Sequence, residues 1–212
     1  MNTYLAGDAD GRNELEALGV SEAELLEAIR RGQYFRDQTN PFHPSSYPGT
    51  RAWAETRAAL CELYVPKGWT AEEPGNLPLI ISPDGEVAIV VSSGSQEVGE
   101  PDKRPKTRNT KGFMTVDAIN VNRVQLRLDL PDVRVLPGKV QRVRALWILL
   151  LYREEDVVKA ELSLPQGLTA GVVDQWAKRI ILPAMNLASA RQPVPAAVDE
   201  GPEIVPVVRR KS

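Results

Sequence analysis

The spacing of apolar residues predicts a helix near the start of the chain. Ser21 and Glu24 stand in the positions of a capping box, in which the serine accepts from the backbone and the glutamate reaches back. Leu25 and Ile29 then share one helical face, which predicts a short helix ending at about Gly32.

A second helix is predicted after a loop over residues 37–50, which is rich in Pro, Ser and Asn. Thr50 is the expected N-cap, and Pro66 with Gly68 ends the helix. The apolar positions at helical spacing are Trp53, Leu60, Cys61 and Tyr64.

From Leu79 the apolar period changes from helical to extended. Residues 79–82 and 87–93 predict two strands joined by a tight turn, with Gly85 in the left-handed position. Residues 93–112, rich in Gly, Pro and charge, are predicted to interrupt the sheet.

Three further strands are predicted after this interruption. Residues 124–130 alternate between apolar and polar side chains, as in a half-buried strand. Residues 143–152 become apolar on both faces, which is typical of a central strand. Residues 158–164 alternate again and are predicted to pair with them across the Arg-Glu-Glu-Asp turn.

Pro165 and Gly167 are predicted to end the sheet, and a helix is expected from about Thr169 to Pro183. Its apolar face would hold Val172, Val173, Trp176, Ala177, Ile180 and Ile181. The fold class is therefore α+β, with a mainly antiparallel sheet of about five strands, N-terminal helices and a C-terminal helix packed on it.

The expected organisation is a frayed segment over residues 1–20, one α+β domain over 21–187 and a mobile Pro/Val-rich tail over 188–212. No secretory signal is recognisable, the longest apolar stretch is too short for a membrane helix, and a single cysteine forms no internal disulfide. These features favour the cytoplasm. The excess of Arg over Lys and the abundance of Ala are typical of a GC-rich bacterial genome.

Charge is segregated along the chain although the net charge is only −2. Residues 1–102 carry a net −10, residues 103–144 a net +8 and residues 145–212 none. Such asymmetry indicates an electrostatic partner, or an acidic half that packs beside the basic segment.

The residues for several common chemistries are absent. One His and one Cys cannot assemble a zinc site, and the Asp8–Asp10 segment lacks the closing glutamate of a calcium loop. A Cys61–His43 dyad would need the fold to bring the two residues together. With no nucleotide-binding or acyl-transfer motif, we expect no cofactor.

A divalent-metal nuclease is one alternative. Asp84 follows a strand as in such sites, but Lys159 and Glu161 stand in the reverse of the usual order. The simpler interpretation is that Asp84 favours the turn. The stretch 92–99 offers small residues for a phosphate cradle, although acids surround it.

Two basic segments carry the leading hypothesis, a non-enzymatic protein that contacts DNA or RNA phosphates. The expected contact residues are Lys103, Arg104, Lys106, Arg108 and Lys111 in the first segment, and Arg134, Lys139, Arg142 and Arg144 in the second. The alternative is a protein-interaction factor, an adaptor or inhibitor that can also form oligomers, which uses the Pro-rich loop, the tail and the segregated charge.

Overall fold

The fold was analysed in a computed structural model, which describes residues 1–128, 133–136, 139–142 and 145–188, with side chains for 1–123 and 145–188. The helices are α1 (Ala9–Ala17), α2 (Glu22–Asp37), α3 (Tyr47–Tyr64) and α4 (Phe113–Leu128), with single 3-10 turns η1 (Val65–Lys67) and η2 (Pro74–Asn76). The strands are β1 (Asn2–Leu5), β2 (Thr70–Glu72), β3 (Leu79–Ile81), β4 (Val87–Ser93), β5 (Val133–Leu136), β6 (Lys139–Arg142), β7 (Ala145–Glu154), β8 (Val157–Thr169), β9 (Val172–Ile181) and β10 (Met185–Asn186).

The fold is α+β, as predicted, but the main sheet is mixed and has eight strands. Its order is β1-β9-β8-β7-β4-β3-β2, with β10 also paired to β8, and β5 and β6 form a separate hairpin. Two pairs, β4 with β7 and β1 with β9, are parallel. The prediction of about five antiparallel strands is wrong because it missed the crossover through α4 that makes β7 parallel to β4.

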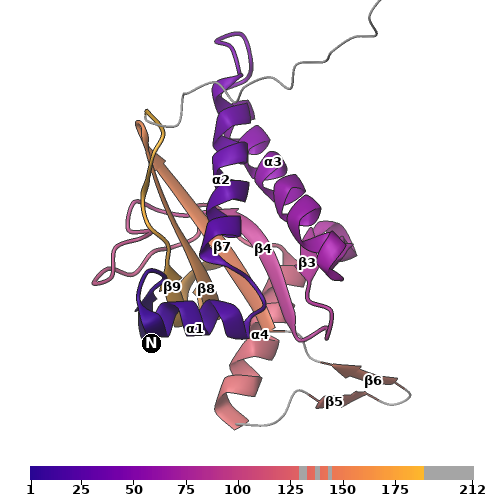
Figure 1. The fold of residues 1–212 in the computed structure, drawn as a ribbon. Coiled ribbons are helices and arrows are strands. Elements are labelled where there is room, and N and C mark those ends of the chain that lie inside the picture. The colour runs from indigo at the N-terminus through magenta and orange to yellow at the C-terminus, as the bar shows by residue number, and fades with distance from the viewer. Residues whose placement is uncertain (129–132, 137–138, 143–144, 189–212) are drawn as a thin grey trace, which may run out of the picture.

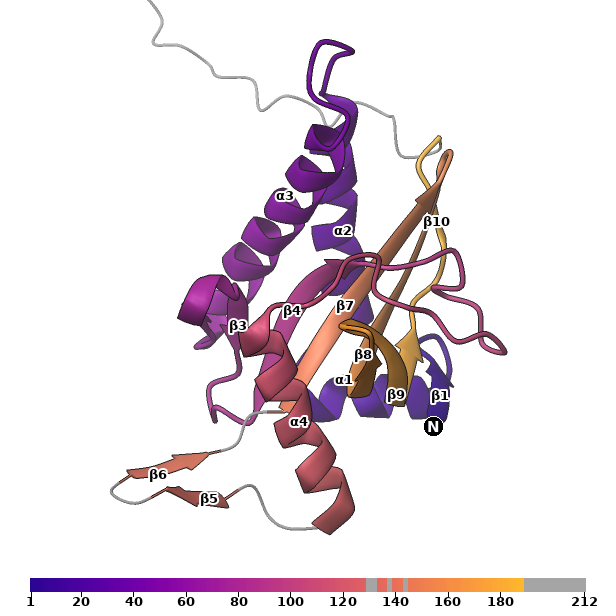
Figure 2. The ribbon, with the colours of Figure 1, turned by 180° about the vertical axis from the view of Figure 1, so that it is seen from behind.

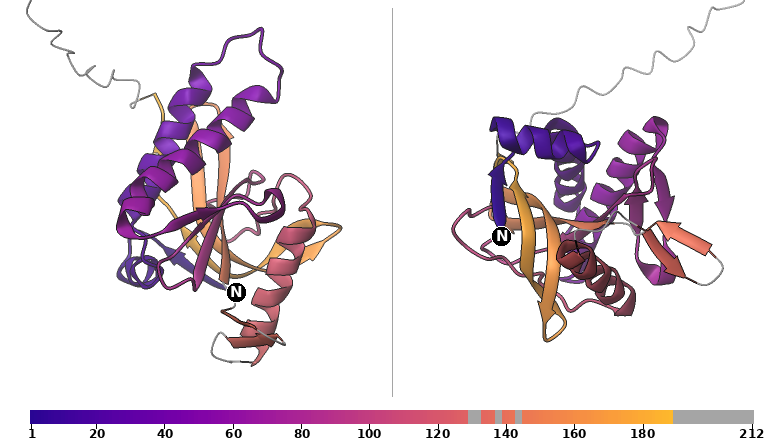
Figure 3. Two further views of the ribbon diagram at one scale, coloured as in Figure 1. Left: turned by 90° about the vertical axis from the view of Figure 1, so that its right-hand side faces the viewer. Right: turned by 90° about the horizontal axis from the view of Figure 1, so that it is seen from below.

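Helices cover both faces of this sheet. In Figure 1, α2 and α3 lie in front of the sheet, and in Figure 2, from behind, α4 lies in front of it. The view from below in Figure 3 shows the sheet between them. One core joins α1–α3 to β7 and β8 through residues such as Leu25, Leu60, Trp147 and Leu162. A second core joins Ile119 of α4 to the opposite face of the sheet.

The two predicted N-terminal helices are present but longer than expected. Ser21 caps α2 by accepting from the Glu24 N–H at 3.3 Å, while its own N–H donates to the Tyr64 hydroxyl, also at 3.3 Å. Gly32 does not end α2 because it serves close packing: a Cβ there would collide with Thr56 of α3. α3 begins at Tyr47, before the predicted cap, and Pro48 suits its first turn.

Residues 1–20, predicted as frayed, form β1 and α1 instead. β1 pairs in parallel with β9, and Leu15 of α1 is 2% exposed in the core. The tertiary partner therefore orders a segment with little local periodicity. Of the predicted tail over 188–212, residues 189–212 lie outside the described residues.

The helix predicted from about Thr169 to Pro183 is wrong, since this segment is strand β9. β8 does not end at Pro165 but continues to Thr169, and a turn at Ala170 and Gly171, both at positive φ, starts β9. Register shifts between β8 and β9 leave Asp174 and Ala177 without a paired residue opposite. These bulges space the buried Val173, Trp176 and Ile180 by three and four residues, which imitates a helix.

The strand predicted over 124–130 is also wrong, because α4 extends through Leu128. The buried positions of its first part are Thr115, Ile119 and Asn122, four and three residues apart, as on a helix face. Asn122 binds the sheet directly: its amide donates to the carbonyls of Leu146 and Pro165 at 2.9 and 3.2 Å. The hairpins β3–β4 and β7–β8 are confirmed.

Candidate functional site

The first basic segment lies on a loop, residues 94–112, that is fixed to the sheet at several points (Figure 2). The indole N–H of Trp176 donates to the Pro105 carbonyl at 2.8 Å. Thr107 and Val173 exchange two hydrogen bonds of 3.0 and 3.1 Å, and the N–H of Arg108 donates to the Ser93 carbonyl at 2.9 Å. The backbone of the basic segment is thus held in place from β4 and β9.

A fully buried ion pair anchors the start of the same loop. Arg179 of β9 and Glu161 of β8 are both 0% exposed and lie 2.5 Å apart at their closest atoms. Arg179 also donates to the carbonyls of Glu100 and Lys103 at 3.1 and 2.6 Å. Glu161 accepts from the N–H of Gly99 at 3.0 Å. Each charge is therefore compensated by its partner and tied to the loop.

Four of the five predicted basic side chains of this segment are exposed to solvent: Lys103, Arg104, Lys106 and Arg108. Among the residues whose side chains are described, none of these four has an ion-pair partner. Two acids of the N-terminal helices, Glu14 and Asp37, pair with Lys178 and Arg153 instead. Within the loop itself, the charge of Lys103 interacts with the carboxylates of Glu97 and Glu100.

Lys111, the fifth, is only partly exposed. Its ammonium donates to the Ser92 hydroxyl at 2.5 Å, and burial lowers the pKa of Lys111 to about 8. Its backbone N–H donates to Gly171 at 2.8 Å, which fixes the end of the loop on the β8–β9 turn. Lys111 is therefore directed to the interior rather than to a phosphate in solution.

The second basic segment is described only in its backbone. Arg134 lies in β5 and pairs with Gln141, while Lys139 and Arg142 lie in β6, paired with Leu136 and Val133. Arg144 lies outside the described residues.

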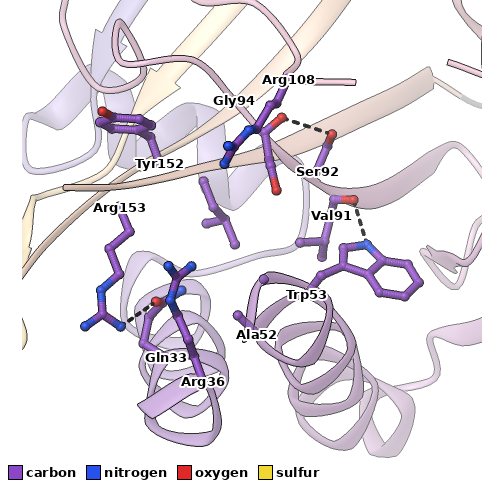
Figure 4. A pocket seen from close by; sticks show the side chains of 13 residues that line it. Gln33, Arg36, Ala52, Trp53, Val91, Ser92, Gly94, Arg108, Tyr152 and Arg153 are labelled. Carbon is purple, nitrogen blue, oxygen red and sulfur yellow. Dashed lines mark hydrogen bonds between the residues drawn. The ribbon is translucent and has the colours of Figure 1, made fainter. Parts of the chain in front are cut away.

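Beside the basic loop, Figure 4 shows a pocket where three arginines from three segments converge. Arg36 comes from α2, Arg108 from the loop and Arg153 from β7. The cavity has a volume of about 100 Å³, and none of its lining residues is acidic. Sequence analysis named Arg108 but missed the other two, because no local pattern links α2 to β7.

The three arginines differ in how they are compensated. Arg153 forms an ion pair with Asp37 at 2.7 Å and donates to the side-chain oxygen of Gln33 at 3.3 Å. The guanidinium groups of Arg36 and Arg108 have no hydrogen-bond or ion-pair partner among the described side chains. Burial lowers the pKa of Arg36, and the charges of Arg153 and Arg108 lower it further. The pocket therefore carries positive charge that the surrounding described residues only partly balance.

The structure does not assemble the candidate Cys61–His43 dyad. His43 stacks on Tyr47 at 4.5 Å, and Cys61 lies 14 residues further along α3, about 21 Å away along the helix axis. The Cys61–His43 dyad is therefore not assembled. Burial raises the pKa of the Cys61 thiol, which disfavours the reactive thiolate.

The residues considered for a nuclease are engaged elsewhere. Asp84 accepts from the Ser82 hydroxyl at 2.5 Å and from the Glu86 N–H at 3.0 Å, which stabilises the β3–β4 turn. Lys159 pairs with Glu100 at 2.7 Å, and Glu161 pairs with Arg179. Within the described part of the chain, no three His, Cys, Asp or Glu side chains gather as metal ligands would.

The stretch 92–99 does not offer its backbone to a phosphate. The N–H groups of Gly94, Ser95 and Val98 donate to Leu151, Lys106 and Ser95, at 2.8, 2.9 and 3.1 Å. Asp8 stands at the N-cap of α1, and Asp10 lies in its first turn. Of the helices that the structure describes, none has the length and apolar character needed to cross a membrane.

Comparison with known proteins gives no relative to this chain. No protein-family model matches it, and neither the curated proteins nor the solved structures contain a significant match.

Proposed function

We propose that this protein is a non-enzymatic binding protein that contacts the phosphate backbone of nucleic acid through its basic loop. The observation that carries the proposal is the combination of exposed, unpaired cations with a fixed backbone: Lys103, Arg104, Lys106 and Arg108 extend from a loop held by buried side chains. Because its backbone is already held, the loop loses little backbone entropy on binding, and its cations release counterions from the phosphates. Arg134, Lys139, Arg142 and Arg144 of the second basic segment remain predicted phosphate contacts.

Neutralising the basic loop is expected to remove salt-sensitive binding. The test variant changes Lys103, Arg104 and Lys106 to Gln, which leaves Arg108 intact. If each cation contacts one phosphate, the plot of log K against log salt for the variant on duplex DNA has a slope shallower by about 2–3 than that of the unmodified protein. The affinity of the variant at 50 mM salt is expected to fall at least about tenfold. Fluorescence anisotropy with labelled duplex DNA and duplex RNA of the same sequence measures both and compares the two nucleic acids.

A charge-matched control separates this interface from a general charge effect. It changes Arg12, Arg30 and Lys67, on or beside the N-terminal helices, to Gln, with the same loss of three charges. Its affinity is expected to stay within about threefold of the unmodified protein. Absence of binding by the unmodified protein at 50 mM salt, or an equal loss in both variants, contradicts the proposal.

A second candidate function, a protein-interaction factor, is favoured by the tip of the α2–α3 hairpin. Phe42 lies in the connecting loop with its side chain 96% exposed, next to the stacked pair of His43 and Tyr47. An apolar ring so exposed is a candidate contact in self-association.

Self-association through this tip predicts a dimer whose mass falls to that of the 23.4 kDa chain when Phe42 is changed to Ser. Size-exclusion chromatography with light scattering at about 100 μM protein measures the mass, and Phe113→Ser, which removes another exposed ring, is the control. A monomer before substitution rules out self-association at this concentration.

A further inference from the structure

The pocket formed by Arg36, Arg108 and Arg153 has the charge and size of a site for a small anion. Among the described residues, three guanidinium groups and the Asp37 carboxylate that pairs with Arg153 sum to about +2. The ammonium of Lys111, bonded to Ser92 of the lining, adds to the positive charge. A phosphate monoester carries about −1.5 to −2 at pH 7, whereas a phosphodiester in a nucleic-acid backbone carries only −1. The charge therefore matches a terminal phosphate better than an internal one.

The volume supports the same class of ligand. The cavity volume is about 100 Å³, whereas about 10–15 Å³ on a comparable measure already holds one water molecule. This is enough room for a phosphoryl group, and the rest of a larger ligand would extend into solvent through the open side.

Gln33 contributes a neutral side-chain donor to the lining of the pocket. Gln33 is 3% exposed and lines the cavity between Arg36 and Arg153 (Figure 4). Its side-chain oxygen accepts from Arg153, and its amide nitrogen has no partner among the described residues. The amide of Gln33 therefore has N–H groups that can donate to an anion in the cavity.

We propose that this pocket binds the terminal phosphate of a phosphomonoester. Arg36 and Arg108 supply the unpaired charge, Arg153 supplies a guanidinium already oriented by Asp37, and Gln33 supplies a neutral donor. This inference goes beyond the proposed contact between the basic loop and the phosphate backbone of nucleic acid. It does not require that contact, because Arg36 and Arg153 do not belong to the loop. The phosphate comes either from a small molecule or from the 5′ end of a nucleic acid.

Isothermal titration of the full chain with inorganic phosphate and with glycerol 3-phosphate tests the site. Arg36→Gln and Arg108→Gln are each expected to weaken binding at least about tenfold, while Arg30→Gln, on the same helix but outside the lining, leaves it unchanged. Binding is expected to weaken between pH 7.5 and pH 5, because the second phosphate pKa is about 6.

Two forms of one single-stranded DNA oligonucleotide, with and without a 5′-phosphate, separate the sources. A preference of tenfold or more for the phosphorylated form, lost in Arg36→Gln, assigns the site to a nucleic-acid end. Arg36-dependent binding of the small probes without this preference assigns it to a small phosphomonoester. The variant with Lys103, Arg104 and Lys106 changed to Gln keeps phosphate binding if the pocket is independent, so loss of backbone contact and loss of the pocket are distinguishable.

The inference is overturned if no phosphate-bearing probe binds in an Arg36-dependent manner. A structural role for Arg36 is also measurable: because burial and the neighbouring Arg153 both disfavour its charge, Arg36→Gln is expected to leave the Tm of the unliganded protein unchanged or higher. A fall of more than about 4 °C would show that Arg36 stabilises the fold instead, and would equally overturn the inference.

Discussion

Replacing Arg179 with Met is expected to destabilise the protein by about 3–5 kcal/mol, because it leaves the fully buried carboxylate of Glu161 without its counter-charge. The carbonyls of Glu100 and Lys103 lose their donor in the same substitution. Urea unfolding followed by circular dichroism measures the change in the free energy of unfolding.

The neighbouring residue provides a matched control. Lys178, next in β9, forms a partly exposed ion pair with Glu14, with side chains 35% and 22% exposed. Lys178→Met is expected to cost about 1 kcal/mol or less. Equal effects of the two substitutions would contradict the assigned role of the buried pair.

The loop gives a second, local measurement of the same effect. Arg179→Met is expected to speed tryptic cleavage after Lys103, because the carbonyl of Lys103 is one of the atoms that Arg179 holds. The double variant Glu161→Met with Arg179→Met is expected to recover part of the lost stability, since no buried charge then stays uncompensated. It is not expected to restore protection of the loop.

Lys111 is expected to make the free energy of unfolding rise with pH above about 8. Its pKa is about 8 in the folded protein, because of burial, and 10.5 in the unfolded chain. Between these values the unfolded chain holds a proton that the folded protein has released, so stability increases with pH. The full penalty, present below pH 8, is about 3 kcal/mol by linkage.

The comparison with Lys111→Met isolates this contribution. The raised pKa values of Cys61 and Tyr64 have the opposite effect on the free energy of unfolding. In the unfolded chain Cys61 loses its proton above about pH 9 and Tyr64 above about pH 10, while both keep it in the folded protein, so stability falls as pH rises further. The difference between unmodified protein and variant removes both effects. Because the hydrogen bond to Ser92 offsets about 1 kcal/mol, the variant is expected to be more stable by about 2 kcal/mol at pH 7.

Urea unfolding at pH 7, 8.5 and 10 is the measurement, and the advantage of the variant is expected to shrink at each step. Lys106→Met removes an exposed lysine from the same loop and serves as the control. A constant difference across the three pH values would show that the ammonium of Lys111 is not destabilised by burial.

The candidate site was only partly predictable. A run of basic residues is visible in the sequence, and four of its five side chains are exposed. The sequence did not show which of the five side chains is directed inward. Lys111 is the one, because its ammonium bonds Ser92 of β4, 19 residues away in the chain. Arg36 and Arg153 are 117 positions apart, and only the packing of α2 against the sheet brings them to one pocket.

The sequence by itself determined the elements whose signals are local. Ser21 caps α2 by a bond within four residues, and the turn around Gly85 joins two strands of clear period. These interactions lie within one turn of helix or one hairpin, so a short stretch of chain contains them completely.

Only the tertiary structure decided the segments whose apolar spacing fits two periods. In β9 the bulges at Asp174 and Ala177 change the spacing of buried residues from every second residue to every third or fourth. They lie where β9 pairs with β8 at and beyond Pro165. In α4 the face that carries Ile119 and Asn122 is buried because β7 and β8 lie beneath it. The parallel pairing of β4 with β7 uses the crossover through α4, and the three arginines meet where α2, β7 and the loop line one pocket. The sequence shows how charge is distributed along the chain. The place where these charges meet is decided by contacts between residues that lie far apart in the sequence.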